Sequence, residues 1–138
     1  MDKSLNYLSL ARKAGLAELG EEPVGASARA LKAHLILVAS DASDHTWRRA
    51  KSFVAGTDQQ CLSVPFTKEE LGFVVGRTSL AIAAFTDVSM ALAFVKALPE
   101  QEKVKKELEF LEAKSKKMRQ RKKEADAHKK NVRFGKKK

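Results

Sequence analysis

The sequence predicts an α/β protein in which a three-layer α/β/α sandwich is followed by a basic tail. Short apolar runs alternate with amphipathic segments of helical period, and turn or capping residues separate them. Such alternation is typical of a sheet that helices cover on both faces. The chain has 138 residues, of which 43% are hydrophobic. That is enough for one domain with a buried core and for an appendage.

The first half of the chain predicts two helices, a buried strand and a third helix. Asp2 is a typical N-cap for the first helix. The two acids and the proline of residues 21–23 suit the first turn of the second helix, where the helix dipole favours acids. Residues 35–39 form an apolar run bounded by polar residues, which indicates a central strand buried on both faces. Residues 40–44 form a loop that caps a third, basic helix.

The second half predicts two further strands, each followed by a helix. Residues 61–64 form the second strand of the chain, and residues 67–70 match a capping box for a short helix. Residues 80–85 form a third strand, after which Thr86 and Asp87 cap a last helix of the body. These elements place a body at residues 1–98 and a tail at residues 99–138.

The tail carries almost all of the net charge of +10. Residues 1–98 contain 11 Lys and Arg against 10 Asp and Glu, whereas residues 99–138 contain 16 against 7. We expect a charged helix that frays into disorder, with a polyanion as its partner. A thin apolar stripe runs along its first part: Val104, Leu108, Leu111 and Met118.

The chemistry-bearing residues do not form a catalytic or metal-binding pattern. Cys61 is the only cysteine and lies within an apolar strand pattern, which favours a packing role. The histidines are far apart at positions 34, 45 and 128, without metal-ligand spacing. We therefore expect no enzymatic activity, no cofactor and no bound metal.

The short hydrophobic runs bear on the cellular location that we expect for the protein. None approaches the roughly 20 apolar residues that span a bilayer. The N-terminal segment is interrupted by charges and is typical of an amphipathic helix, not of a signal peptide. We expect a cytoplasmic monomer without a membrane partner.

Two surface features could bind a ligand. Asp41 and Asp44 follow the strand at residues 35–39, where many α/β folds bind ligands, although loop formation and helix capping already give both residues a sufficient role. Arg48, Arg49 and Lys51 lie on one predicted helix and could contact phosphate, or could simply be a solvated face.

Several spaced motifs resemble the ribosomal L-seven-Ae / L-thirty-e family, and its bacterial YlxQ-type members in particular. They are Gly-Glu-Glu-Pro-Val at 20–24, the segment 32–41, Lys-Glu-Glu-Leu-Gly at 68–72, and Ala-Ala-Phe-Thr-Asp at 83–87. The resemblance covers residues 4–96. It implies a three-layer sandwich around a four-stranded mixed sheet, and it implies binding to kink-turn RNA, a sharply bent helix with tandem sheared G·A pairs.

The resemblance also implies the RNA-contacting residues. A helix start would read the RNA, and a loop before the last strand would cover a flipped-out nucleotide. These positions, with Asp41 beside them, are Gly20, Glu21, Glu22, Pro23, Ala26, Arg77, Thr78, Ser79 and Leu80. The family pattern is Gly-x-Asn-Glu with Lys three residues later. Here Glu22 stands for Asn, Pro23 for Glu and Ala26 for Lys, which places a carboxylate beside the RNA and removes a cation.

These observations favour a non-catalytic RNA-binding protein that recognises kink-turn-like or ribosomal RNA through the body and contacts phosphates through the tail. An alternative is a ribosome-associated protein–protein adaptor, or a partner of RNA-processing proteins, that uses the apolar stripe of the tail. A third hypothesis is a substrate-binding module for an RNA methyltransferase, since related sandwich domains precede such enzymes.

Overall fold

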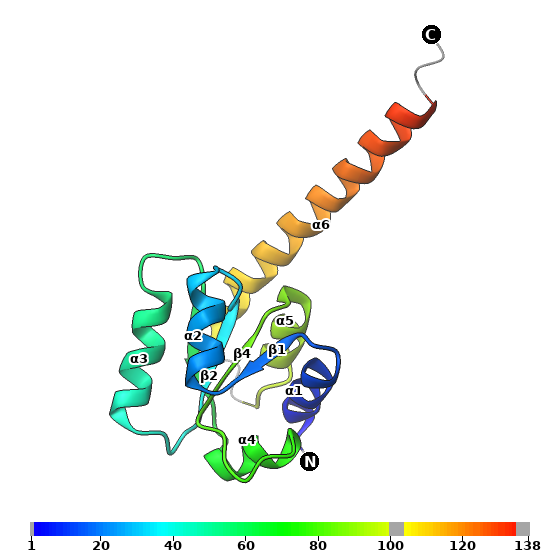
Figure 1. Ribbon diagram of the computed structural model, residues 1–138. Helices are drawn as coiled ribbons and strands as arrows, with labels where there is room; N and C mark the ends of the chain where they lie inside the picture. The colour runs from blue at the N-terminus through cyan, green and yellow to red at the C-terminus, as the bar shows by residue number, and fades with distance from the viewer. Residues whose placement is uncertain (1, 100–103, 135–138) are drawn as a thin grey trace.

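The computed structural model describes residues 2–99 and 104–134, with the side chains of the last helix described through residue 120. Helices and strands alternate along the body, as the sequence predicts (Figure 1). The elements are α1 (Lys3–Lys13), β1 (Ala17–Leu19), α2 (Glu21–Arg29), β2 (Leu35–Val38), α3 (Asp44–Val54), β3 (Gln60–Ser63), α4 (Lys68–Val74), β4 (Ile82–Phe85), α5 (Val88–Lys96) and α6 (Lys105–Phe134).

The strands form one mixed sheet in the order β1-β4-β2-β3. β4 pairs antiparallel with both β1 and β2, and β2 pairs parallel with β3. All four residues of β2 and of β4 are buried, because these central strands are covered on both faces. The four-stranded mixed sheet is therefore confirmed, although β4 begins at Ile82 and not at the predicted residue 80.

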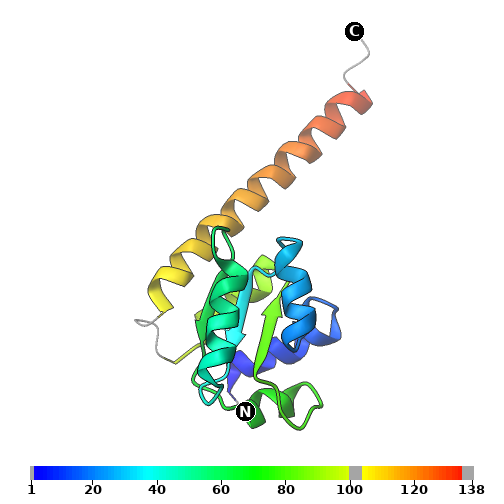
Figure 2. The same cartoon turned by 60° about the vertical axis from the view of Figure 1, so that its left-hand side comes forward.

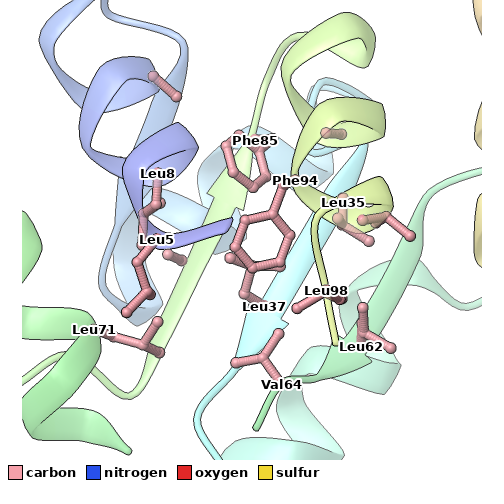
Figure 3. Packing of buried hydrophobic residues seen from close by; sticks show 14 of the residues in the cluster. Leu5, Leu8, Leu35, Leu37, Leu62, Val64, Leu71, Phe85, Phe94 and Leu98 are labelled. Carbon is pink, nitrogen blue, oxygen red and sulfur yellow. The ribbon is translucent and has the colours of Figure 1, made fainter. Parts of the chain in front are cut away.

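Alternate residues of the central strands enter two separate cores, which defines the three layers. Leu35 and Leu37 pack with α1, α4, α5 and α6, where the Phe85 and Phe94 rings lie 5.2 Å apart (Figure 3). Ile36 lies on the opposite face, in a second core with α2 and α3. The predicted α/β/α sandwich is confirmed.

The expected caps are present at the helix starts. Asp2 accepts a hydrogen bond from the Ser4 amide, Ser43 from Thr46, and Asp87 from Met90. The Thr67 and Glu70 side chains form the reciprocal capping box of α4. Each of these caps satisfies amides that the helix itself leaves unpaired.

The first half of α6 is part of the packed body. Leu111 and, just before the helix, Val104 are buried in the larger core, and Lys114 Nζ lies 3.4 Å from Asp58 Oδ2. The domain boundary at residue 98 stays a prediction, but buried packing continues through Ser115. The helix continues to Phe134, and the fraying of the tail into disorder stays a prediction.

The second half of α6 projects from one end of the molecule. Lys114 contacts Asp58, which precedes β3, and shares a hollow with His34, which precedes β2. The helix therefore leaves from the end where β2 and β3 begin, while α4 lies at the other end (Figures 1 and 2). Among the described residues, no helix is both long and apolar enough to cross a membrane.

Candidate nucleic-acid interface

The structure brings the start of α2 and the loop of residues 77–80 together. A Cβ atom placed on Gly20 would lie 3.7 Å from Arg77 Nη1. The backbone connects the same segments, because the Gly20 amide donates to the Ile82 carbonyl, 3.0 Å away. Two segments more than 50 residues apart in the sequence thus form one surface, at the end where α4 lies (Figure 1).

The first turn of α2 is shaped by its N-cap glycine. Gly20 has a φ of 96°, in the left-handed region that glycine adopts without steric penalty. It carries no capping side chain, so no N-cap side chain bonds the first-turn amides at the positive end of the helix dipole. Glu22, Pro23 and Ala26 are all exposed.

Glu21 forms an ion pair with α3. Its Oε1 accepts a hydrogen bond from Arg49 Nε at 2.6 Å, and the Arg49 guanidinium also lies over the Phe53 ring, 5.0 Å from its centroid. Both ends of the pair are partly exposed, so its net contribution to stability is about 0–1 kcal/mol. Its larger effect is electrostatic, because Arg49 offsets the negative charge of Glu21 beside the helix start.

This pair also changes the expectation for the basic residues of α3. Arg49 is engaged by Glu21, and Lys51 Nζ lies over the Trp47 ring at 5.8 Å from its centroid. Two of the three predicted phosphate-binding cations therefore already have partners within the protein.

The loop of residues 77–80 rests directly on α4. The Arg77 amide donates to the Gly72 carbonyl at 2.8 Å, and the Leu80 amide donates to the Lys68 carbonyl at 2.9 Å. A Cβ atom on Gly72 would lie 2.8 Å from both Arg77 O and Ser79 N, so only glycine allows this approach. Leu80 is buried in the core, which leaves Arg77, Thr78 and Ser79 exposed.

Asp41 has a structural partner at the same end. Its Oδ1 accepts a hydrogen bond from the Lys68 amide at 2.8 Å, which ties the loop after β2 to the start of α4. Asp41 therefore positions the surface, and its carboxylate also lies beside the predicted loop.

An open hollow of about 470 Å³ lies between these segments. We call it the Arg77 hollow, and the residues that line it are Asp41, Lys68, Glu69, Phe73, Arg77, Thr78 and Ser79. The sequence predicts four of these residues as part of the site, but not Lys68, Glu69 and Phe73. The helical period could have identified Phe73, since a helix with apolar positions at 71, 74 and 75 places residue 73 off its buried face.

The surroundings of Cys61 and His34 shift the pKa values of both side chains. Burial raises the pKa of the Cys61 thiol, which lowers the thiolate fraction that a nucleophile needs. Burial, followed by the charge of Lys114, lowers the pKa of His34 and favours its neutral form. No group of three or more His, Cys, Asp or Glu side chains among the described residues could hold a metal ion.

Comparison with known proteins supports the fold class. No protein-family model matches the chain, and no curated protein matches its sequence. One similar solved structure is a protein of unknown function from Bacillus halodurans, with 22% identity and a TM-score of 0.66 over 72% of this chain and 100% of that chain. Another is the Giardia lamblia 15.5kD RNA binding protein, with 15% identity and a TM-score of 0.56 over 67% of this chain and 82% of that chain. At such low identity, the likeness shows that the fold is shared.

Proposed function

We propose that this chain is a non-catalytic RNA-binding protein of the ribosomal L-seven-Ae / L-thirty-e type, which recognises structured RNA. The surface that binds the RNA is formed by the start of α2 and the loop of residues 77–80. The observation that carries the proposal is the proximity of the Arg77 guanidinium to Gly20 at the uncapped start of α2. The RNA is kink-turn-like or ribosomal.

The electrostatics of this surface support an anionic partner. The start of α2 is the positive end of a helix dipole, and Arg77 adds a full positive charge beside it. Two positive groups repel each other when unoccupied, and a phosphate between them relieves that repulsion. Glu22 opposes binding, whereas the charge of Glu21 is offset by Arg49.

The fold comparison gives further support. One of the similar structures is a protein described as RNA binding, and the similarity extends over 67% of this chain. The sequence motifs at residues 20–24, 32–41 and 68–72 resemble a family of RNA-binding proteins independently of that comparison.

The second half of α6 adds sequence-independent contacts to phosphates. Residues 116–134 contain nine Lys and Arg against two acids, and they extend about 28 Å at 1.5 Å per residue. Because α6 leaves from the end opposite α4, these contacts involve a different part of the RNA from the part bound at Arg77.

The apolar stripe that an adaptor function would require is largely internal. Val104 and Leu111 are buried against the body, so neither side chain is available to a protein partner. The adaptor is therefore not proposed as a second function.

A binding assay with matched variants tests the proposal. Fluorescence anisotropy would measure the affinity for a kink-turn RNA and for the same RNA with its G·A pairs replaced. We expect Arg77→Gln to weaken binding to the kink-turn RNA about 10- to 150-fold, since a charge-assisted contact contributes about 1.5–3 kcal/mol. Arg29→Gln makes the same charge change at the far end of α2 and should leave the affinity nearly unchanged. Equal effects of both variants, or equal binding of both RNAs, would contradict recognition by this surface.

A further inference from the structure

Phe73 is the most exposed large hydrophobic side chain among the described residues. Its exposed fraction is 75%, compared with 60% for Leu31 and 54% for Leu10. Leu71 and Val75, which lie on either side of it in the chain, are buried in the larger core. The fold therefore does not need an aromatic ring at position 73, and water contact with the ring is unfavourable.

The surroundings of the ring match a particular class of ligand. Phe73 lines the Arg77 hollow, and every other residue lining it is polar. A protein partner that inserted an aliphatic anchor would meet charged and hydroxyl groups on all other sides. A nucleobase fits better, because it has an apolar face that stacks on an aromatic ring and a polar edge that needs donors and acceptors.

The charges of the hollow favour a base over a phosphate at this position. Within the hollow, Lys68 and Arg77 are balanced by Asp41 and Glu69. A phosphate is therefore held better between Arg77 and the start of α2, where the helix dipole adds positive charge. Carboxylates can accept hydrogen bonds from the amino groups of bases, and the hydroxyls of Thr78 and Ser79 can donate or accept. A volume of about 470 Å³ lies within the usual range of small-ligand sites.

A second hollow beside Phe73 is less suited to RNA. Phe73 lines this smaller hollow of about 330 Å³ with Asp2, Leu5, Glu69, Glu70 and Val74, and its three carboxylates repel a phosphate backbone. A strand of RNA therefore approaches Phe73 from the Arg77 side, which is also the side of the proposed binding surface.

We propose that Phe73 is a stacking platform for an unpaired nucleobase of RNA, held in the Arg77 hollow. The base lies against the Phe73 ring, and its edge contacts the polar groups of the hollow. This inference rests on the proposed function, to which it adds a specificity-determining residue and the class of ligand that this residue contacts.

A double-mutant cycle, in which a protein variant is combined with an abasic RNA, tests whether Phe73 stacks on a base. The RNAs are a duplex with a three-nucleotide bulge beside tandem G·A pairs, and three versions in which each bulge nucleotide in turn lacks its base. The proteins are the full chain, Phe73→Ala, Phe73→Tyr and, as a control, Leu31→Ala, which removes an exposed apolar side chain at the other end of α2. Circular dichroism checks that each variant is folded.

Stacking predicts a specific pattern of affinities. Phe73→Ala should weaken binding about 5- to 150-fold, whereas Phe73→Tyr and Leu31→Ala should stay within about threefold of the full chain. With the full chain, one of the abasic RNAs should bind more weakly than the intact RNA by the same factor. With Phe73→Ala, that abasic RNA should bind as well as the intact RNA does, because the two changes remove the same contact.

Other results overturn the inference, and they separate it from the proposed function. One such result is that Phe73→Ala binds the intact RNA as well as the full chain does. Another is that the affinity lost through Phe73→Ala multiplies with the affinity lost at every abasic site. In either case Phe73 does not stack on a base, but the proposed function is unaffected. If the full chain binds none of the RNAs, the proposed function fails too. Loss of a co-purifying protein on Phe73→Ala, without loss of RNA affinity, identifies the ring as a protein contact instead.

Discussion

Gly72 shows how a single residue shapes the candidate interface. Alanine is the better helix former by about 1 kcal/mol, which on its own would favour Gly72→Ala in α4. The added Cβ, however, would meet the backbone of Arg77 and Ser79 at 2.8 Å, and backbone atoms cannot move aside cheaply. Overpacking of this kind costs about 1–3 kcal/mol, so the clash outweighs the gain in propensity.

We therefore expect Gly72→Ala to lower the free energy of unfolding by up to about 2 kcal/mol and to weaken RNA binding through displacement of Arg77. Urea denaturation measures the first effect and anisotropy the second. Phe73→Ala, on the same helix but exposed, should change the unfolding free energy by less than about 0.5 kcal/mol. Equal stability of Gly72→Ala and the full chain would show that the loop adapts to a Cβ.

Glu22 is the residue at which the sequence departs most sharply from the RNA-reading pattern of the family it resembles. Glu22→Asn replaces an exposed carboxylate with an amide that can donate as well as accept. We expect kink-turn affinity to rise about 2- to 10-fold, corresponding to roughly 0.5–1.5 kcal/mol for one added hydrogen bond.

The control for charge alone is Glu109→Gln, which removes an exposed carboxylate from α6. It should raise affinity less, and equally for the RNA with and without G·A pairs. A gain of the same size from both variants would assign the Glu22 effect to net charge and not to base reading.

At this scale the sequence identified positions but not all of their roles. It pointed to Arg77, Thr78 and Ser79, which the structure places together at one surface. It could not show that Leu80 is buried or that Arg49 is engaged by Glu21, because both depend on contacts between distant segments. The helical pattern of α4 leaves Phe73 off the buried face, but no sequence motif connects it with the binding surface.

At the scale of elements, α6 is the clearest test of where the folded body ends. Leu111 is fully buried, whereas Met118 lies further along the same helix and is about half exposed. Truncation of a buried leucine removes its burial energy and leaves a cavity, which together cost about 2–5 kcal/mol.

We expect Leu111→Ala to lower the free energy of unfolding by about 2–4 kcal/mol in chemical denaturation. Met118→Ala should change it by less than about 0.5 kcal/mol. A small effect at both positions would show that α6 is not docked on the body, and a large effect at both would extend the docked segment beyond Ser115.

The sequence predicted most elements because each has a local signal, such as the capping box of α4 or the apolar run of β2. It predicted three strands from pattern alone. β1 has only three residues and forms because the edge of β4 offers it antiparallel partners. The docking of α6 on the body could not be predicted either. A thin apolar stripe in a highly charged segment indicates packing on the body only when the core is known to have an uncovered side there.

At the scale of the whole molecule, the separation of charge from the binding surface makes the salt dependence informative. The body is nearly neutral, and residues 116–134 of α6 carry most of the excess cations. Each phosphate that a cation neutralises releases counterions and steepens the fall of log affinity with log salt by about 0.7–0.9.

We expect replacement of Lys116, Lys117, Lys122 and Lys123 by glutamine to reduce that slope by about 2–4, and to do so for both kink-turn and control RNA. Glutamine has nearly the helix propensity of lysine, so α6 should remain helical. The same number of substitutions in the body, at Lys3, Arg12, Lys13 and Lys32, should change the slope by less than about 1. Equal slopes for the two variants would show that the tail makes no dedicated phosphate contacts.

The projecting helix also determines how the molecule moves through solution. A helix of 30 residues is about 45 Å long, and its second half extends from the body without covering any of it. Friction depends on shape as well as mass, so a 15.2 kDa monomer of this form diffuses more slowly than a sphere of equal mass. Gel filtration would therefore assign a monomer too large a mass, and sedimentation equilibrium or light scattering is the appropriate measure of its oligomeric state.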